Sequence, residues 1–213
     1  MKVFNLSFTL KHLVIVSLGI ILLTACESDD DNTFINENNI DQQVTETDID
    51  ALLFMIEEEK LARDTYDFLY DQWGISIFDN ISNSEQSHMN ALENLLINYN
   101  IDYDILPAGE FNDSDLQNFY NQFVDDGSQS LANSLQIGAT IEDLDIVDLQ
   151  QNIDETSNAQ IIAVFESLKC GSRNHLRSFV NTIETNGNAY TPQFLNVEDY
   201  NTIIDGSHEQ CNN

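Results

Sequence analysis

Apolar residues recur at alternating intervals of three and four along four long segments of the chain. These segments span about 48–72, 78–99, 129–152 and 158–184. This period places apolar side chains on one face of a helix, and no strand-like alternation extends beyond a few residues. The only two prolines, Pro107 and Pro192, fall outside the periodic segments. The pattern predicts an all-α domain over residues 48–206, followed by a short tail over 207–213.

The lengths of the connections predict how the four helices are arranged. Thr47 is expected to cap the first helix and Gly74 to end it, so that a short turn leads into the second helix. A few residues near Asp154 join the third helix to the fourth, and short connections of this kind produce antiparallel hairpins. About 30 residues over 100–128 separate the two pairs, with a short helix expected at 113–125. A connection of this length allows a crossover between two parallel helices.

The face of each predicted long helix is apolar at its ends and polar at its centre. In the third helix a competing apolar face, with Ile137, Ile141 and Leu144, leaves the phase open. Burying several carboxylates costs many kcal/mol unless a positive charge compensates, so this layer predicts a metal site. The predicted metal-ligating residues are Glu59, Glu85, His88, Glu142, His175 and, as a further candidate, Asp145.

Two features of this layer leave alternatives open. Glu85 and His88 are three residues apart, which puts both side chains on one helix face, but Glu and His also occur at this spacing on helix surfaces. Arg63 lies one turn from Glu59, so its guanidinium could neutralise the carboxylates without a metal. Glu57 and Glu58 lie off the polar face and are expected to be solvated. Tyr66 is expected in the core or as a hydrogen-bonding neighbour of the site.

Several motifs resemble those of the ferritin-like superfamily: Glu59-Lys60-Leu61-Ala62-Arg63-Asp64, Glu85-x-x-His88, Ile141-Glu142 and Gly171-Ser172-Arg173-Asn174-His175. More narrowly, residues 52–204 resemble an exported branch of it, domain of unknown function 2202 (DUF2202). The resemblance implies a ferritin-like four-helix bundle with a long crossover connection between helices 2 and 3. It also implies di-iron ligand positions at Glu59, Glu85, His88, Glu142 and His175. Ser172 departs from the pattern, because a glutamate is expected there; Asp145 or water could replace that carboxylate.

The first 25 residues have the pattern of a secretory signal. Lys2 and Lys11 precede an apolar run over 13–23, which is too short to span a bilayer and ends at Ala25-Cys26. This ending resembles a lipobox, which implies cleavage before Cys26 and lipidation of its thiol. An ordinary signal peptide with an incidental cysteine is the alternative. Residues 26–47 are predicted to form an acidic disordered tether.

The acidic run after Cys26 resembles an export signal that takes lipoproteins to the surface of the outer membrane, although it could also be a plain spacer. We therefore expect an envelope protein, held in the outer membrane by the Cys26 lipid and potentially surface-exposed. Cys170 and Cys211 then remain as an even pair in an oxidising compartment, and a disulfide is expected between them, with two free thiols as the alternative. A caged assembly is not expected of a tethered subunit; we expect a monomer or dimer.

Charge and ligand chemistry narrow the range of functions. The chain has 7 basic and 37 acidic residues and a net charge of −30, which argues against a nucleic-acid partner. Mixed carboxylate and imidazole ligands suit one or two iron ions, with manganese or zinc as alternatives. Iron in such a site supports an oxidase, peroxidase or ferroxidase. The competing hypotheses are a non-catalytic metal-binding lipoprotein and an envelope scaffold without metal.

Overall fold

The computed structural model describes residues 44–211, and the regular secondary structure of this part of the chain is α-helical. Its six helices are α1 (Glu46–Trp73), α2 (Ser76–Asn98), α3 (Ser114–Gly127), α4 (Leu131–Glu155), α5 (Ala159–Thr185) and α6 (Val197–Ile204). No strand occurs in residues 44–211, which confirms the all-α prediction. None of the described helices is long and apolar enough to cross a membrane. The predicted signal segment, Cys26 and most of the predicted tether lie outside the described residues.

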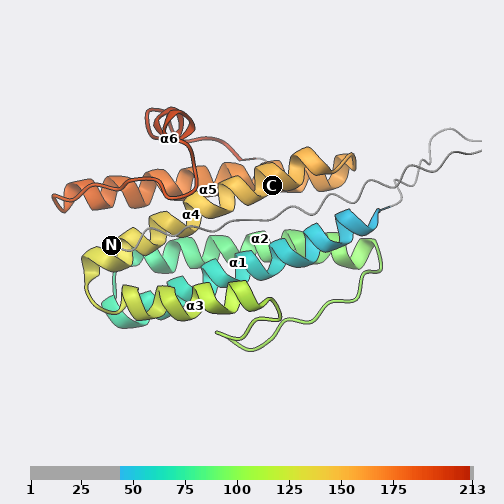
Figure 1. Ribbon diagram of the computed structural model, residues 1–213, viewed down its shortest axis with the longest axis horizontal. Coiled ribbons are helices and arrows are strands. Elements are labelled where there is room, and N and C mark those ends of the chain that lie inside the picture. Colours follow the sequence, from blue (N-terminus) through green and yellow to red (C-terminus); the bar gives the residue numbers. More distant parts are fainter. Residues whose placement is uncertain (1–43, 212–213) are drawn as a thin grey trace, which may run out of the picture. The chain divides into compact units, whose positions relative to one another are not determined.

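The first hairpin consists of α1 and α2, which run in opposite directions (Figure 1). α1 begins earlier than predicted because Thr45, rather than Thr47, is its cap. The Thr45 hydroxyl accepts a hydrogen bond from the Asp48 amide, and the Asp48 carboxylate accepts one from the Thr45 amide, so the pair forms a capping box. Gly74 ends α1 as predicted: it adopts a φ of 67°, which glycine tolerates, and its N–H donates to the Tyr70 carbonyl.

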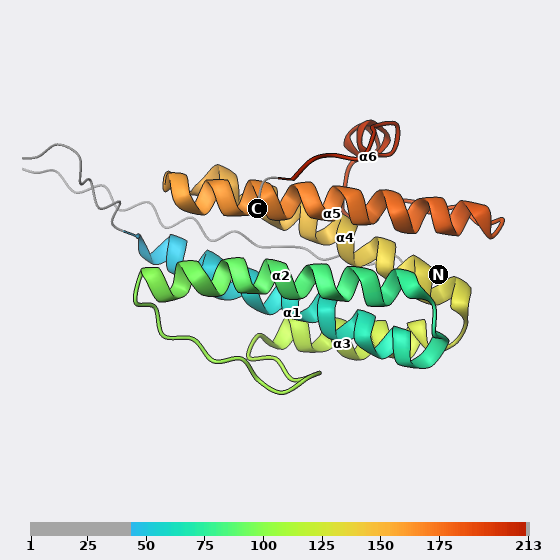
Figure 2. The same cartoon turned by 180° about the vertical axis from the view of Figure 1, so that it is seen from behind.

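The second hairpin consists of α4 and α5, and it packs against the first. α4 contacts α1 and α5 contacts α2, so the two hairpins lie side by side (Figures 1 and 2). α2 and α4 run in the same direction, as the long connection between them allowed. The short predicted helix in that connection is α3, which packs on α1 and α4.

Two apolar clusters fill the interior on either side of the polar layer. One is built around Leu52, Met89, Leu149 and Phe165, and the other around Tyr66, Phe78, Leu135 and Phe179. In α1, α2 and α5, the polar positions at the centre of the helix lie in sequence between residues of the two clusters. The apolar ends and polar centres that the sequence predicts for the helices therefore form the apolar and polar layers of the core.

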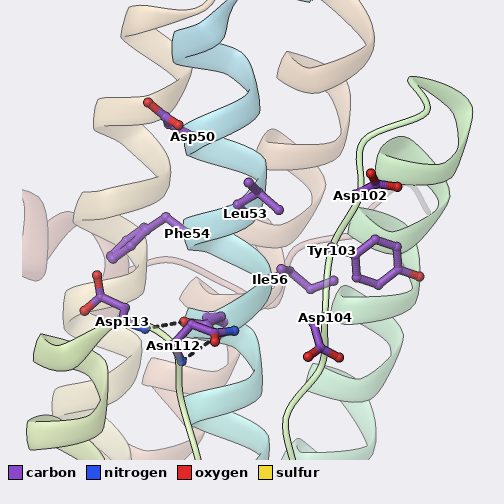
Figure 3. Close-up of a pocket in the computed structure, with 10 residues that line it drawn as sticks. Asp50, Leu53, Phe54, Ile56, Asp102, Tyr103, Asp104, Asn112 and Asp113 are labelled. Carbon is purple, nitrogen blue, oxygen red and sulfur yellow. Dashed lines mark hydrogen bonds between the residues drawn. The ribbon is translucent and has the colours of Figure 1, made fainter.

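The connection between α2 and α3 is held by charged side chains of α1. The Glu57 carboxylate accepts hydrogen bonds from the amides of Asn112 and Asp113 at 2.9 and 2.8 Å and from the Asn112 side chain at 2.9 Å (Figure 3). The prediction that Glu57 and Glu58 are solvated is wrong, because both are buried. α1 is covered on three sides, by α2, α3 and α4, and therefore has little exposed face.

Lys60 fixes the same connection from the next turn of α1. Its ammonium group donates to the Asp64 carboxylate at 2.5 Å and to the carbonyls of Pro107 and Glu110 at 3.0 and 3.1 Å. Asp64 in turn accepts from the Gly109 amide at 2.9 Å. Lys60 is only 1% exposed, yet all three of its donor positions are used.

The C-terminal tail lies along α5. A disulfide joins Cys170 in α5 to Cys211, with 5.6 Å between the Cα atoms and 41 residues of sequence separation. This is the predicted pair. Beside it, Glu209 accepts hydrogen bonds from Arg173 at 2.9 Å and from Arg177 at 2.6 Å, and together these contacts hold the tail against the helix. His208 in the tail is exposed.

Candidate metal centre

Glu85 lies between two histidines at the centre of the helical core. Its Oε2 atom is 2.7 Å from Nδ1 of His88, one turn further along α2, and its Oε1 atom is 2.9 Å from Nδ1 of His175 in α5. The two imidazole rings are stacked, with 5.7 Å between their centroids. One carboxylate therefore contacts both imidazoles, one through each oxygen.

A second carboxylate approaches each imidazole from another helix. Glu59 of α1 places Oε2 3.1 Å from Nδ1 of His88, and Glu142 of α4 places Oε2 3.4 Å from Nδ1 of His175. Among the described residues, two groups have ligand atoms close enough to share an ion, and Glu85 belongs to both. These groups are Glu59, Glu85 and His88, and Glu85, Glu142 and His175. In each group the potential ligand atoms lie within 4.8 Å of one another.

The hydrogen bonding of these atoms is incomplete, which fits a metal site. Oε1 of Glu59, Oε1 of Glu85 and Nδ1 of His175 are buried and have no hydrogen-bond partner among the described residues. The contact between His175 and Glu85 is short, but its angles are not those of a hydrogen bond. Buried polar atoms are rarely left unsatisfied, and atoms that converge without bonding one another can bind a cation between them. The donor set therefore fits the metal that the sequence predicted.

The pKa values of these groups reflect strong mutual interaction. Burial raises the pKa of Glu59 to about 7, although contact with His88 opposes the rise. Burial also favours neutral Glu85, but His175 and His88 outweigh it and bring the pKa of Glu85 below its usual range. Burial lowers the pKa of an imidazole, yet Glu85 and Glu142 raise the pKa of His175 to about 10. Without a metal, protons on the histidines compensate the carboxylates.

Tyr66 completes the site on the side of Glu142. Its hydroxyl lies 2.5 Å from Oε1 of Glu142 and 3.2 Å from the carbonyl of Gly138. The ring is fully buried and packs on Phe179, with 5.4 Å between centroids. Both predicted roles apply, because Tyr66 is a core residue that also donates to a predicted ligand. This hydrogen bond fixes the orientation of the Glu142 carboxylate.

Gly171 allows α5 to approach His88. A Cβ atom at this position would lie 2.6 Å from Nε2 of His88, which is closer than real Cβ contacts allow. The glycine in the Gly171-Ser172 pair thus provides space for the imidazole of the neighbouring helix. A larger residue there would displace His88 from Glu59 and Glu85.

Asp145 lies beside the two ligand groups but belongs to neither. It is 5% exposed, and its Oδ2 atom accepts a hydrogen bond from the hydroxyl of Ser172. Ser172 is the position at which the resemblance to ferritin-like proteins implied a glutamate, and the structure places the carboxylate of Asp145 next to it. Oδ1 of Asp145 has no partner among the described residues.

Arg63 does not neutralise the site, so the alternative based on it is wrong. Its guanidinium donates to Asp64 at 2.7 and 3.0 Å and to the side chain of Gln86 at 2.7 Å. These partners hold Arg63 away from Glu59. Its guanidinium instead forms an ion pair with Asp64, which also accepts a hydrogen bond from Lys60.

Two acidic residues near the site were not identified from the sequence. Glu58 is 2% exposed and interacts with Asp148 of α4. The sequence signal that could have indicated Asp148 is its position three residues after Asp145, on the same side of α4. Asp148 lies outside the polar face that contains Glu142 and Asp145. By contrast, the ≈ 460 Å³ pocket beside α1 contains four aspartates and no histidine among its lining residues (Figure 3). It is separate from the Glu/His layer.

Comparison with known proteins matches almost the whole described domain. Residues 48–207 match the family described as Uncharacterized protein domain (DUF2202). The uncharacterized protein MJ0754 of Methanocaldococcus jannaschii is 44% identical over 171 residues, which cover 79% of this chain and 92% of that protein. The crystal structure of this hypothetical protein superposes with a TM-score of 0.77 over 78% of this chain and 96% of that one.

Proposed function

The chain belongs to the DUF2202 family, and we propose that it is a ferritin-like metalloprotein of the cell envelope with a two-iron oxidoreductase site. In this proposal α1, α2, α4 and α5 are the four helices of a ferritin-like bundle. Two antiparallel hairpins joined by a long crossover support it, because ferritin-like bundles have this connectivity. Glu59, Glu85, His88, Glu142 and His175 would hold the ions.

The single observation that carries the proposal is the position of Glu85. Its two oxygens face two different imidazoles, and each imidazole has one further carboxylate beside it. A carboxylate shared by two otherwise similar ligand groups is suited to bridging two adjacent cations. A single structural ion would require only one of these two ligand groups.

The residues of the chain would prepare the site rather than carry out the chemistry. Bound iron would supply the capacity to change between ferrous and ferric states and to react with oxygen or peroxide. Tyr66 orients Glu142, and Gly171 provides the space that His88 occupies. Because both histidines hold protons in the metal-free protein, binding of a cation would release protons, and affinity would fall at low pH.

A second candidate function is non-catalytic metal binding, and Ser172 is the observation that favours it. The serine removes one carboxylate from the ferritin-like pattern, and a smaller donor set is compatible with zinc or manganese held for structural reasons. An envelope scaffold that binds no metal is the third candidate. Lipidation at Cys26, location in the outer membrane and a monomeric or dimeric state remain part of the proposal.

Metal loading of the full chain tests the proposed function. The protein, purified in non-ionic detergent, would be stripped with chelator, loaded with ferrous iron under argon, desalted and analysed for metal. We expect about two irons per chain, faster oxidation of added ferrous iron than in buffer, and less than half the iron in Glu85→Ala and His88→Ala. Glu184→Ala and His208→Ala are matched controls, because both residues are exposed.

Each outcome favours one of the three candidates. Two irons that turn over with oxygen support the redox site. Stable binding of iron or zinc without turnover favours the non-catalytic function. Equal metal content in the site variants and the exposed controls would contradict any function based on Glu85 and His88.

A further inference from the structure

The pocket beside α1, with a volume of ≈ 460 Å³, has an apolar floor. Leu53, Phe54 and Ile56 of α1 form this floor, and all three belong to the apolar core or pack against it. Figure 3 shows them between two arms of the connection that follows α2, residues 101–105 on one side and 112–113 on the other. A concave site of this size with apolar walls is suited to the apolar part of a small molecule.

Both arms of the connection are fixed, so the pocket is preformed. The buried Glu57 carboxylate accepts hydrogen bonds from two backbone amides of the second arm, at 2.9 and 2.8 Å. On the first arm, the Ile101 N–H donates to the Leu96 carbonyl at 2.9 Å, and Tyr103 packs against the apolar core. A preformed site loses less conformational entropy when a ligand binds than a site that must first become ordered.

The rim of the pocket carries negative charge that no described residue compensates. Asp50 of α1 and Asp102 and Asp104 of the first arm are exposed, and their carboxylates have no ion pair or hydrogen bond among the described residues. The fourth aspartate, Asp113, is already engaged as the N-cap of α3. No lysine, arginine or histidine lines the pocket. The three rim carboxylates (Asp50, Asp102 and Asp104) are therefore complementary to a cationic ligand.

The rim carboxylates are spread around the floor rather than gathered at one point. None of them belongs to the groups of described residues whose ligand atoms lie close enough to share a metal ion. Figure 3 shows Asp102 and Asp104 along one side of the floor and Asp50 near its upper end. A single metal ion would contact only part of this rim. An elongated molecule with several positive groups joined by apolar segments can contact the carboxylates and the floor together.

We propose that this pocket binds a linear polyamine, an organic cation whose ammonium groups are separated by short methylene chains. The methylene groups lie on Leu53 and Phe54, and the ammonium groups pair with the rim carboxylates. The acidic segment 27–43 of this chain does not fit, because the same carboxylates repel it. The pocket is separate from the Glu/His layer, so the proposal goes beyond the iron function and does not depend on it.

Calorimetric titration of the full chain with spermidine tests this proposal. The protein would be kept in non-ionic detergent at neutral pH and physiological ionic strength, which screens weak binding to the acidic surface. We expect one saturable site per chain, with affinity on the order of tenfold lower in the double variant Asp102→Asn/Asp104→Asn. Leu53→Asn retains the charges but makes the floor polar, and it should lower affinity about fivefold. None of these positions is fully buried, so the variants should fold.

A matched control separates the pocket from the acidic surface as a whole. Asp71→Asn/Asp205→Asn removes the same charge at exposed positions outside the pocket and should bind spermidine as tightly as wild type. An equal loss of affinity in this control, binding that does not saturate, or unchanged affinity in Leu53→Asn would overturn the proposal. A lysine-rich peptide titrated in parallel should bind more weakly than spermidine. Tighter binding of the peptide would also overturn the proposal, because the occupant would then be a protein segment.

Discussion

α1 contains two sets of buried charged residues that differ in how they are compensated. Glu57, Lys60 and Asp64 are almost completely buried, and every one of them is bonded to backbone groups of the connection before α3. Glu58 and Glu59 are equally buried, yet three of their four oxygens have no hydrogen-bond partner among the described residues. Neighbouring residues of α1 thus differ in whether their buried charged groups have hydrogen-bond partners.

The presence or absence of hydrogen-bond partners separates structural from functional buried charges better than the degree of burial does. A satisfied buried charge stabilises the arrangement around it, because removing one partner leaves the other without compensation. An unsatisfied buried charge costs stability and requires a ligand or a proton to be tolerated. On this basis Glu57, Lys60 and Asp64 hold the crossover in place, whereas the carboxylates of Glu58 and Glu59 lie outside that network.

The largest effect is expected at the satisfied set. Asp64→Ala should lower the free energy of unfolding by about 3–5 kcal/mol, because Lys60 would be left buried without its carboxylate partner. Asp71→Ala, at an exposed position of the same helix, should change it by less than about 0.5 kcal/mol. Urea unfolding measured by circular dichroism compares the two. Similar values for both variants would show that the crossover is not held by this pair.

The unsatisfied set should make the stability of the metal-free protein depend on pH. The pKa of His175 is raised from 6.5 to about 10, so its stabilising protonation is complete below pH 6.5 and is lost as the pH rises through 10. We expect the free energy of unfolding to fall across this range. His175→Gln should flatten the profile, and the exposed His208→Gln should not. Parallel profiles for wild type and His175→Gln would contradict the assignment.

A smaller effect on stability is expected when the adjacent residues Glu57 and Glu58 are substituted and compared. Glu57→Gln should destabilise the metal-free protein by about 1–2 kcal/mol, because a carboxylate that accepts three hydrogen bonds is replaced by an amide. Glu58→Gln should leave stability unchanged or raise it slightly, because it removes an uncompensated charge. Chemical denaturation in the presence of chelator measures both. An equal loss at Glu58 would mean that its carboxylate is satisfied after all.

Much of the fold could be predicted because it depends on local signals. The period of apolar residues located the four long helices, and Gly74 ended α1 as expected. The start of α1 was placed too late because Asp48, three residues after Thr45, completes a capping box that was not considered. The polar centre of each helix also indicated Glu59, Glu85, His88, Glu142 and His175, which the structure brings together.

The errors arose where several helices share one surface. A pattern with one buried face per helix predicts solvated positions for Glu57 and Glu58. α1 is instead buried against α2, α3 and α4, so both residues are buried. The orientation of Arg63 depends on Asp64 and Gln86, and no local pattern distinguishes these partners from Glu59. Such choices depend on tertiary neighbours that the periodicity does not identify.

The central claim is that Glu85 is shared by two metal ions, and anomalous diffraction from crystals of the iron-loaded protein tests it most directly. We predict two anomalous peaks about 3.5–4 Å apart, one beside Glu59 and His88 and the other beside Glu142 and His175, with Glu85 contacting both. A single peak, or peaks located away from Glu85, would contradict the account.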